Sequence, residues 1–250
     1  MSDKTAPRQG FFPFRIPNSE FRIPHFYLAQ SFTKRSPRLY NTDGETFLKG
    51  VLTMTFDQAE RNLKQRGFAV RRFETGAEAA AYLAHEIRNT SVGIGGSKSA
   101  EQLGLYETLS ESNTVYWHWR VPGMETLQKA NAAEVYITGA NALSEDGEIF
   151  NIDGNGNRLA AQVFGRKRVY VLVGKNKLCP DFDSALRRAR EVAATQNVKR
   201  FPDRKTPCQI DGKCHDCRSA DRICRALLVL WAPMFGMHTE VLLIDEALGM

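Results

Sequence analysis

The sequence predicts an α/β fold with a mainly parallel sheet flanked by helices. Short apolar runs at residues 135–138 and 169–173 lack polar alternation, as strands buried on both faces do. Segments with helical spacing of apolar residues alternate with such runs along the chain. At 42% hydrophobic and 25% charged residues, the 250-residue chain can bury the core of one large α/β domain or of two small ones.

Regular alternation begins at residue 51. In chain order the predicted elements are helix 55–67, strand 68–70, helix 75–89, strand 91–94, a helix after Ser97 through 103 or beyond, strand 114–117, helix 124–132, strand 135–138, helix 157–164, strand 169–173, helix 181–193 and two closing strands at 226–231 and 239–244.

Local signals place the ends of the early elements. Phe56, Ala59 and Leu63 share one face of the first helix, and Gly67 gives it a C-terminal stop. Thr75 and the glutamate three residues later have the spacing of a capping box, so the second helix begins there.

The late elements follow from the same rules. The helix at 181–193 is predicted from apolar residues at helical spacing, namely Phe182, Ala185, Leu186, Ala189 and Val192. The apolar runs at 226–231 and 239–244 are close in sequence, so we expect them to form a closing pair of strands.

Residues 1–50 stand apart from the α/β domain at 51–250. An aromatic-Arg-Ile-Pro element occurs at 14–17 and again at 21–24, and the frequent prolines exclude a long helix. Aromatic side chains can bury area along a surface. We expect an extended arm that packs on its own domain or on a neighbouring subunit of a homo-oligomer, and the alternative is a flexible tail.

Composition excludes several classes of protein. The net charge of +6, from 34 basic and 28 acidic residues, is spread along the chain without a basic tail or a nucleic-acid motif. No apolar run approaches 18 residues, and the N-terminal segment lacks the apolar region of a secretory signal. We therefore expect no nucleic-acid partner, no membrane span and a cytoplasmic location.

A glycine-rich turn provides the first candidate binding site. Gly95, Gly96 and Ser97 come directly after a strand and open a helix. Backbone N–H groups at a helix start, with a hydroxyl, favour an anion. The alternative is a tight turn followed by an N-cap serine.

Three carboxylates fall within five residues in the segment Ser-Glu-Asp-Gly-Glu at 144–148. Crowded carboxylates raise one another's pKa, which is one route to a general acid or base near neutral pH. Glu145 is the candidate catalytic residue of this group. The alternative is a β-turn built on Asp146 and Gly147 between two strands.

Polar residues between the two buried runs and just after the second suggest a ligand-binding wall. Amide and carboxylate groups at Asn141, Asp153 and Asn157 can bind hydroxyls or a phosphate-bearing ligand, since loops beyond strand ends are where open α/β sheets bind ligands. Lys175 and Asn176, followed by a second lysine, come just after a strand, where an ammonium group suits a carboxylate or phosphate. A solvated lysine pair is the alternative.

Four of the five cysteines fall within 17 residues, at Cys208, Cys214, Cys217 and Cys224. In a chain without a secretory signal this spacing favours metal or redox chemistry over disulfides. Four thiolates at loop spacing can bind zinc or an iron–sulfur cluster. Reduced structural thiols are the alternative.

Several segments together resemble one family. GIGGS, ITGANALSEDGEIFNIDGNGNR, VGKNK and TPCQIDGKCHDCRSADRIC resemble the LUD-domain, or lactate-utilisation-type, proteins over about residues 51–249. The resemblance implies a fold like that of ribose-5-phosphate isomerases and CoA-transferases, in which Gly95, Gly96 and Ser97 occupy the phosphate-binding turn. The Ser-Glu-Asp-Gly at 144–147 is similar to the Ser-Glu-Asn-Gly of class I CoA-transferases, where the glutamate is the nucleophile, but has Asp146 for the Asn.

The resemblance also implies a role in organic-acid metabolism, because the family is linked to lactate oxidation through iron–sulfur and flavin partner subunits. The leading hypothesis is an accessory or ligand-binding subunit of such a system that binds a small phosphate- or carboxylate-bearing anion. The alternatives are a stand-alone enzyme of CoA-transferase or sugar-phosphate isomerase type, and a metal- or redox-sensing protein that uses the cysteine segment at 208–224.

Overall fold

The computed structural model describes residues 54–250. The predicted arm at residues 1–50 lies outside the described residues. The description below concerns the larger of the two compact units of the chain, Leu52–Met250.

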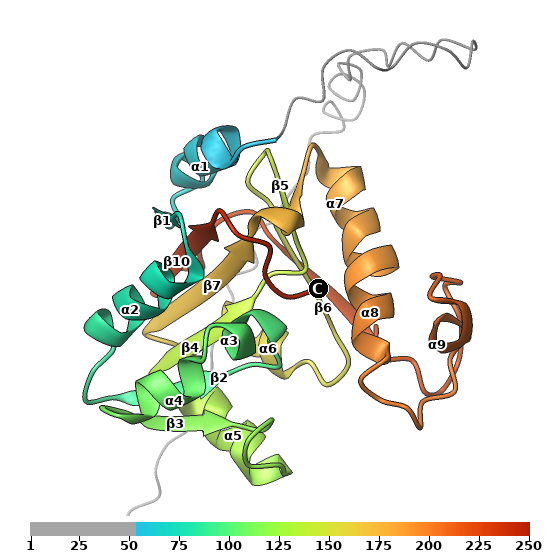
Figure 1. Cartoon of the computed structure of the whole chain (residues 1–250), viewed down its shortest axis with the longest axis horizontal. Coiled ribbons are helices and arrows are strands. Elements are labelled where there is room, and N and C mark those ends of the chain that lie inside the picture. The colour runs from blue at the N-terminus through green and yellow to red at the C-terminus, as the bar shows by residue number, and fades with distance from the viewer. Residues whose placement is uncertain (1–53) are drawn as a thin grey trace, which may run out of the picture. The chain divides into compact units, whose positions relative to one another are not determined.

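A six-stranded sheet forms the centre of this unit (Figure 1). All of its neighbouring strands are parallel, which confirms the prediction of a mainly parallel sheet. From one edge to the other the strands are β1 (Ala69–Phe73), β10 (His238–Ile244), β7 (Arg168–Gly174), β4 (Val135–Gly139), β2 (Ser91–Ile94) and β3 (Thr114–Trp117).

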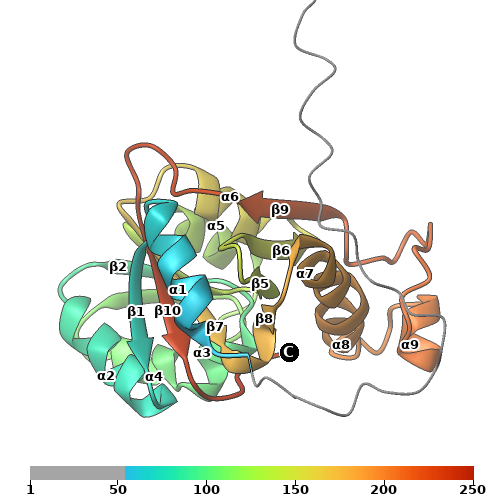
Figure 2. The same cartoon turned by 90° about the horizontal axis from the view of Figure 1, so that it is seen from above.

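Helices cover both faces of the large sheet because its strands are apolar on both sides. Val169, Val171 and Val173 of β7 pack in one core, whereas Tyr170 and Leu172 pack in the other. The first core includes α1 (Phe56–Gln65), α5 (Met124–Ala132) and α6 (Asn157–Val163). The second includes α2 (Gly76–Glu86), α3 (Lys98–Gln102) and α4 (Leu105–Ser110), on the opposite side of the sheet (Figure 2).

A second, four-stranded sheet packs beside the first. Its order is β8 (Leu178–Cys179), β5 (Ala142–Ser144), β6 (Ile149–Asp153) and β9 (Ala226–Leu230), with one parallel and two antiparallel pairings. Phe150 of β6 contacts Phe182 edge to face at 4.9 Å between ring centroids. This contact joins the small sheet to α7 (Phe182–Arg188).

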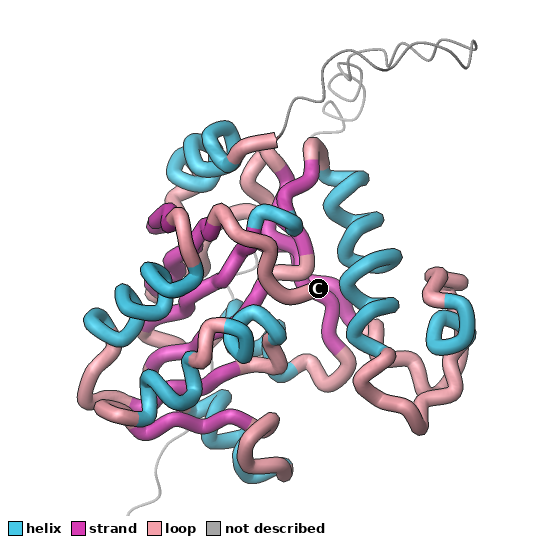
Figure 3. Tube along the Cα trace, viewed as in Figure 1, coloured by secondary structure: helices cyan, strands magenta, loops and turns pink. Residues whose placement is uncertain are grey.

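One long helical column begins with α7 and ends with α8 (Ala194–Val198), and a π-helical segment, Ala189–Ala193, lies between them (Figure 1). Beyond α8 the chain is mainly irregular, with one short helix, α9 (Pro207–Asp211), before β9 (Figure 3). Of the described residues, no helix has both the length and the apolar character needed to cross a membrane.

Most predicted elements are present, and the predictions for the closing strands and for the first strand need correction. The runs at 226–231 and 239–244 are strands but not a pair, because β9 pairs antiparallel with β6 whereas β10 lies between β1 and β7. The strand expected at 68–70 extends to Phe73, since Arg71 and Arg72 form ion pairs with Glu240 and Asp245 and so remain compatible with a sheet.

Candidate functional site

The candidate site lies where three neighbouring parallel strands end. Strands β2, β4 and β7 lead directly into Gly95, Ala140 and Lys175. Two adjoining cavities occupy this position, with volumes of about 140 and 40 Å³. We call them together the strand-end cavity. Residues that line both parts are Gly96, Trp119, Asn141, Arg158, Ala193 and Asn197.

The glycine-serine turn forms the floor of the cavity. The Gly95 N–H donates to the Ile137 carbonyl at 2.9 Å, so this amide is used by the sheet. A Cβ at position 95 would lie 2.9 Å from Cγ of Arg158, and only a glycine leaves room for that side chain. Ser97 Oγ accepts from the Ala100 N–H at 3.2 Å and caps α3, as the alternative interpretation of this turn expects.

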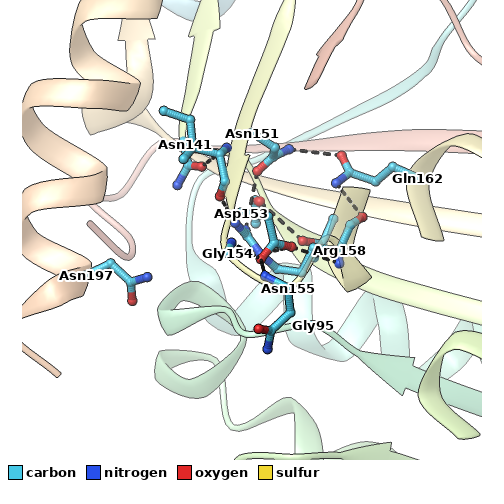
Figure 4. Close-up of polar contacts among 12 residues, drawn as sticks. Gly95, Asn141, Asn151, Asp153, Gly154, Asn155, Arg158, Gln162 and Asn197 are labelled. Atoms are coloured by element: carbon cyan, nitrogen blue, oxygen red, sulfur yellow. Dashed lines mark hydrogen bonds and ion pairs between the residues drawn. The ribbon is translucent and has the colours of Figure 1, made fainter. Parts of the chain in front are cut away.

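Asn141 and Asp153 hold the loops that form one wall (Figure 4). Asn141 Oδ1 accepts from the Ile152 N–H at 2.6 Å. Asp153 Oδ1 accepts from the Gly154 N–H at 2.7 Å, and its Oδ2 accepts from the N–H of Arg158 at 3.0 Å. The carboxylate therefore fixes the turn between β6 and α6, as short polar side chains do in loops.

Arg158 crosses this wall with its guanidinium buried. Its Nε lies 3.5 Å from Asp153 Oδ2, and its other nitrogens donate to Asn151 Oδ1 and to the Ile152 carbonyl. Gln162 joins the same network, since it accepts from Asn151 at 2.9 Å and donates to the Arg158 carbonyl at 2.8 Å (Figure 4). The network leaves Arg158 little freedom to move.

Lys177 is the most unusual ionisable residue of the site. The side chain is buried, with 2% of the residue exposed, and its Nζ donates to Ser99 Oγ at 2.8 Å. Among the described residues, no carboxylate lies within ion-pair distance of this ammonium group. Burial, and then the positive charges of Arg188 and Arg158, lower the pKa of Lys177 to about 7.

Glycines make the space around Lys177. Built Cβ atoms at Gly139 and Gly249 would lie 3.4 and 3.1 Å from its Nζ. The same Cβ at Gly139 would lie 2.9 Å from Ser97 Oγ. Lys177, Ser97 and Ser99 thus meet in the smaller part of the strand-end cavity.

Arg200 lines the larger part of the cavity, and Arg188 contacts the backbone of a lining residue, Asn141. The Arg200 guanidinium stacks over the Trp119 ring at 3.4 Å from its centroid. Arg188 is half-buried and donates to the backbone carbonyls of Asn141 and Asn176. Burial, together with Arg200 and Arg158, lowers the pKa of His118 below its ordinary value. The electrostatic balance of the cavity is therefore positive.

The structure brings most of the predicted ligand-binding residues to this cavity. Gly96, Ser97, Asn141, Asp153 and Asn157 line it, and Gly95 lies beneath Arg158.

Lys175 and Asn176, which follow β7, do not line the strand-end cavity. Lys175 is exposed and does not line the cavity, and Asn176 Oδ1 accepts from the Leu248 N–H at 3.0 Å. The buried lysine of this motif is Lys177. In the sequence, Lys175 comes one residue and Lys177 three residues after the end of β7, and this spacing alone did not indicate which of them is buried.

Glu145 lies in a different place from the ligand-binding residues. It belongs to the turn between β5 and β6, where the Gly147 N–H donates to the Ser144 carbonyl at 2.9 Å. The Glu145 carbonyl accepts from Asn62 of α1 at 2.6 Å, and Glu145 does not line the strand-end cavity. The geometry here is that of the β-turn alternative.

The cysteine segment forms a separate small cavity of about 20 Å³. Cys208, Cys214, Cys217 and Cys224 all line it and are free thiols. In the described part of the chain, no three His, Cys, Asp or Glu side chains stand in positions that could already hold a metal ion.

Comparisons with known proteins identify a family. A family model described as the LUD domain matches residues 56–241. The chain is also similar to a crystal structure of a DUF162 family protein from Deinococcus radiodurans, at 13% identity and a TM-score of 0.43, over 75% of this chain and 94% of that chain. Among curated proteins, none matches the sequence.

Proposed function

Because the chain belongs to the LUD-domain family, we propose that it is an accessory or ligand-binding component of lactate-type organic-acid utilisation. In this proposal it binds a small carboxylate- or phosphate-bearing anion in the strand-end cavity. The subunits that carry out the oxidation, with iron–sulfur or flavin groups, are its proposed partners.

The observation that supports an anion is the buried Lys177. An ammonium group taken out of water without a countercharge is costly, and it is retained where it serves a ligand. Ser99 supplies one hydrogen-bond acceptor, whereas an ammonium has three donors. A bound carboxylate or phosphate would supply the missing acceptors and the missing negative charge.

The shape of the cavity limits the ligand to a small molecule. Its larger part, about 140 Å³, is below the usual volume of pockets for drug-sized ligands. With the anionic group beside Lys177, the rest of the ligand would lie toward Asn141 and Asn157, whose amides suit hydroxyl or carbonyl oxygens. Trp119 and Arg200 would cover it from the rim.

The CoA-transferase alternative receives no support from the position of Glu145. A nucleophilic carboxylate must reach the reacting atom of the substrate. Glu145 contacts α1 through its carbonyl and does not line the strand-end cavity. Binding therefore accounts for more of the geometry than acyl transfer through this residue.

Isothermal titration of the full chain at pH 6.5 tests the proposal, with lactate, inorganic phosphate and ribose 5-phosphate as probes. We expect at least one of them to bind, and Lys177→Met to weaken that binding by roughly 30-fold or more, the cost of losing a charge-assisted contact. Lys175→Met is the matched control, because this exposed lysine is only two residues away. Equal loss in both variants, or no binding by any probe, would contradict the proposal.

A further inference from the structure

The four cysteines come from three pieces of chain that converge. Cys208 lies on α9, Cys214 and Cys217 lie in the irregular segment after it, and Cys224 lies just before β9. All four line the same small cavity, which lies against α8 through Ala194 and Val198. The fold therefore brings the four cysteines together in the lining of one cavity.

Polar groups lie beside two of the thiols. The Arg222 guanidinium lies 3.5 Å from Cys224 Sγ and donates to the Cys217 carbonyl at 2.7 Å. Thr206 Oγ1, on a buried residue, lies 3.4 Å from Cys208 Sγ. Hydrogen-bond donors beside sulfur are typical outer contacts of thiolate-bound metals.

The backbone of this segment can adjust to a metal. Three of the four cysteines lie on irregular backbone, and all four residues are partly exposed. Rotation of their side chains about χ1 is enough to move a sulfur by more than an ångström. The present positions of the described thiols, which do not yet surround an ion, are therefore compatible with closure around one.

The cysteine cavity shares a wall with the strand-end cavity. Ala194 and Ile223 line both. A Cβ built on Gly154 would lie 2.9 Å from the Ile223 carbonyl, so the two loops touch. The Arg225 N–H, next to Cys224, donates to the Asp153 carbonyl at 2.9 Å. Because of these contacts, a change that fixes the cysteine segment in place also restricts the loop that holds Arg158.

We propose that Cys208, Cys214, Cys217 and Cys224 bind a metal centre through four thiolates, and that this centre braces the wall it shares with the strand-end cavity. Zinc and an iron–sulfur cluster share this ligand chemistry. The bracing role rests on the proposed anion site, whereas the metal centre itself does not.

Metal and sulfide analysis of the full chain, purified without oxygen and with its absorption spectrum recorded, is the first test. About one zinc per chain indicates a mononuclear site, and iron with sulfide and a broad visible band indicates a cluster. Either result supports the centre. A folded, metal-free chain that also fails to take up added Zn²⁺ in a competition titration would overturn it.

Cysteine-to-serine variants test which residues bind the metal. Cys214→Ser and Cys217→Ser are expected to lose most of it, whereas Cys179→Ser is the matched control because that buried cysteine lies in β8, outside the cysteine cavity. If the serine variants do not fold, the metal content of the unaltered chain still decides the question. Retention of metal by folded Cys214→Ser and Cys217→Ser variants would contradict the assignment.

Anion titration before and after removal of the metal tests the bracing role. We expect phosphate affinity to fall several-fold in the metal-free chain. Unchanged affinity would overturn the brace and leave the metal centre standing. A metal-loaded chain that binds none of the anions would instead contradict the proposed function, so the two failures are distinguishable.

Discussion

At the scale of single residues, Lys177 makes anion binding depend on pH. Burial and nearby positive charges lower its pKa to about 7, and burial lowers the pKa of His118 below that of a free histidine. An anion prefers the protonated amine. We expect phosphate or carboxylate affinity to fall as the pH rises above 7 and the Lys177→Met variant to lose this dependence. A titration series from pH 6 to 9 checks it, and identical pH profiles in both proteins would count against the role of Lys177.

The same lysine lowers the stability of the fold. Between pH 7 and its ordinary pKa of 10.5, the unfolded chain binds a proton that the folded chain has released, so this contribution to the free energy of unfolding rises with pH across that window. Below pH 7 the full cost of the buried charge remains. We expect Lys177→Met to raise the free energy of unfolding at pH 6 by about 1–4 kcal/mol, as replacement of buried charges by apolar groups often does. Denaturant titration at pH 6 and pH 10 measures it, and a variant less stable than the parent at pH 6 would contradict it.

Gly139 controls the space beside that lysine. An added methyl would crowd Ser97 Oγ at 2.9 Å and Lys177 Nζ at 3.4 Å. We expect Gly139→Ala to fold, with a loss of about 1–3 kcal/mol, and to bind the anion at least tenfold more weakly. Gly165→Ala is the control for a loss of stability alone. Its positive φ of 80° makes an alanine there strained, but nothing lies near the added methyl. If both variants bind equally well, the space at Gly139 is not used by the ligand.

At the scale of elements, the β6–α6 turn depends on one carboxylate. Asp153 accepts from the N–H groups of Gly154, Asn155 and Arg158. We expect Asp153→Ala to lower the free energy of unfolding by about 2–3 kcal/mol, because partly buried N–H groups lose their acceptor and Arg158 loses its ion pair. Thermal and denaturant unfolding measure the loss. Asp146→Ala, at an exposed position in the turn between β5 and β6, is expected to change stability by less than about 0.5 kcal/mol. Similar losses in the two variants would argue against this role of Asp153.

Sequence patterns located the elements of the large sheet well because local chemistry determines their ends. Thr75 and Glu78 form the expected capping box, and Ser97 caps the helix after the glycine turn. The helix expected at 181–193 shows the limit of such patterns. Its π-helical segment changes the spacing, and Val192, expected inside, is 37% exposed.

The small sheet and the full site could not be predicted from local patterns. Strands β5 and β8 have three and two residues, too short for a periodic signal. Lys175 and Lys177 have equal chemistry in the sequence, and only the three-dimensional packing against Ser99 and Gly139 buries the second. Glu145 was predicted to be catalytic because three carboxylates are close together in the sequence. Their closeness in sequence did not indicate whether this turn lies at the strand-end cavity.

At the scale of the whole molecule, the arm predicted at residues 1–50 remains a prediction. Its aromatic residues have area to bury, so we expect a docked segment to resist proteolysis. Limited trypsin digestion followed by size-exclusion chromatography with light scattering checks it, and the mass of the assembly is expected to change when the arm is lost. Rapid removal of the first forty residues with no change in assembly state would rule out docking.

The position of β10 has a consequence for synthesis on the ribosome. Residues 238–244 insert between β1, which otherwise lies alone at the sheet edge, and β7. During translation, β1 has no neighbouring strand until β10 is made some 165 residues later. Over the same interval, the edge of β7 that pairs with β10 has no partner. An open apolar edge is a template for intermolecular pairing. We therefore expect nascent chains that lack residues 238–244 to be prone to intermolecular pairing, and insertion of β10 to close the sheet.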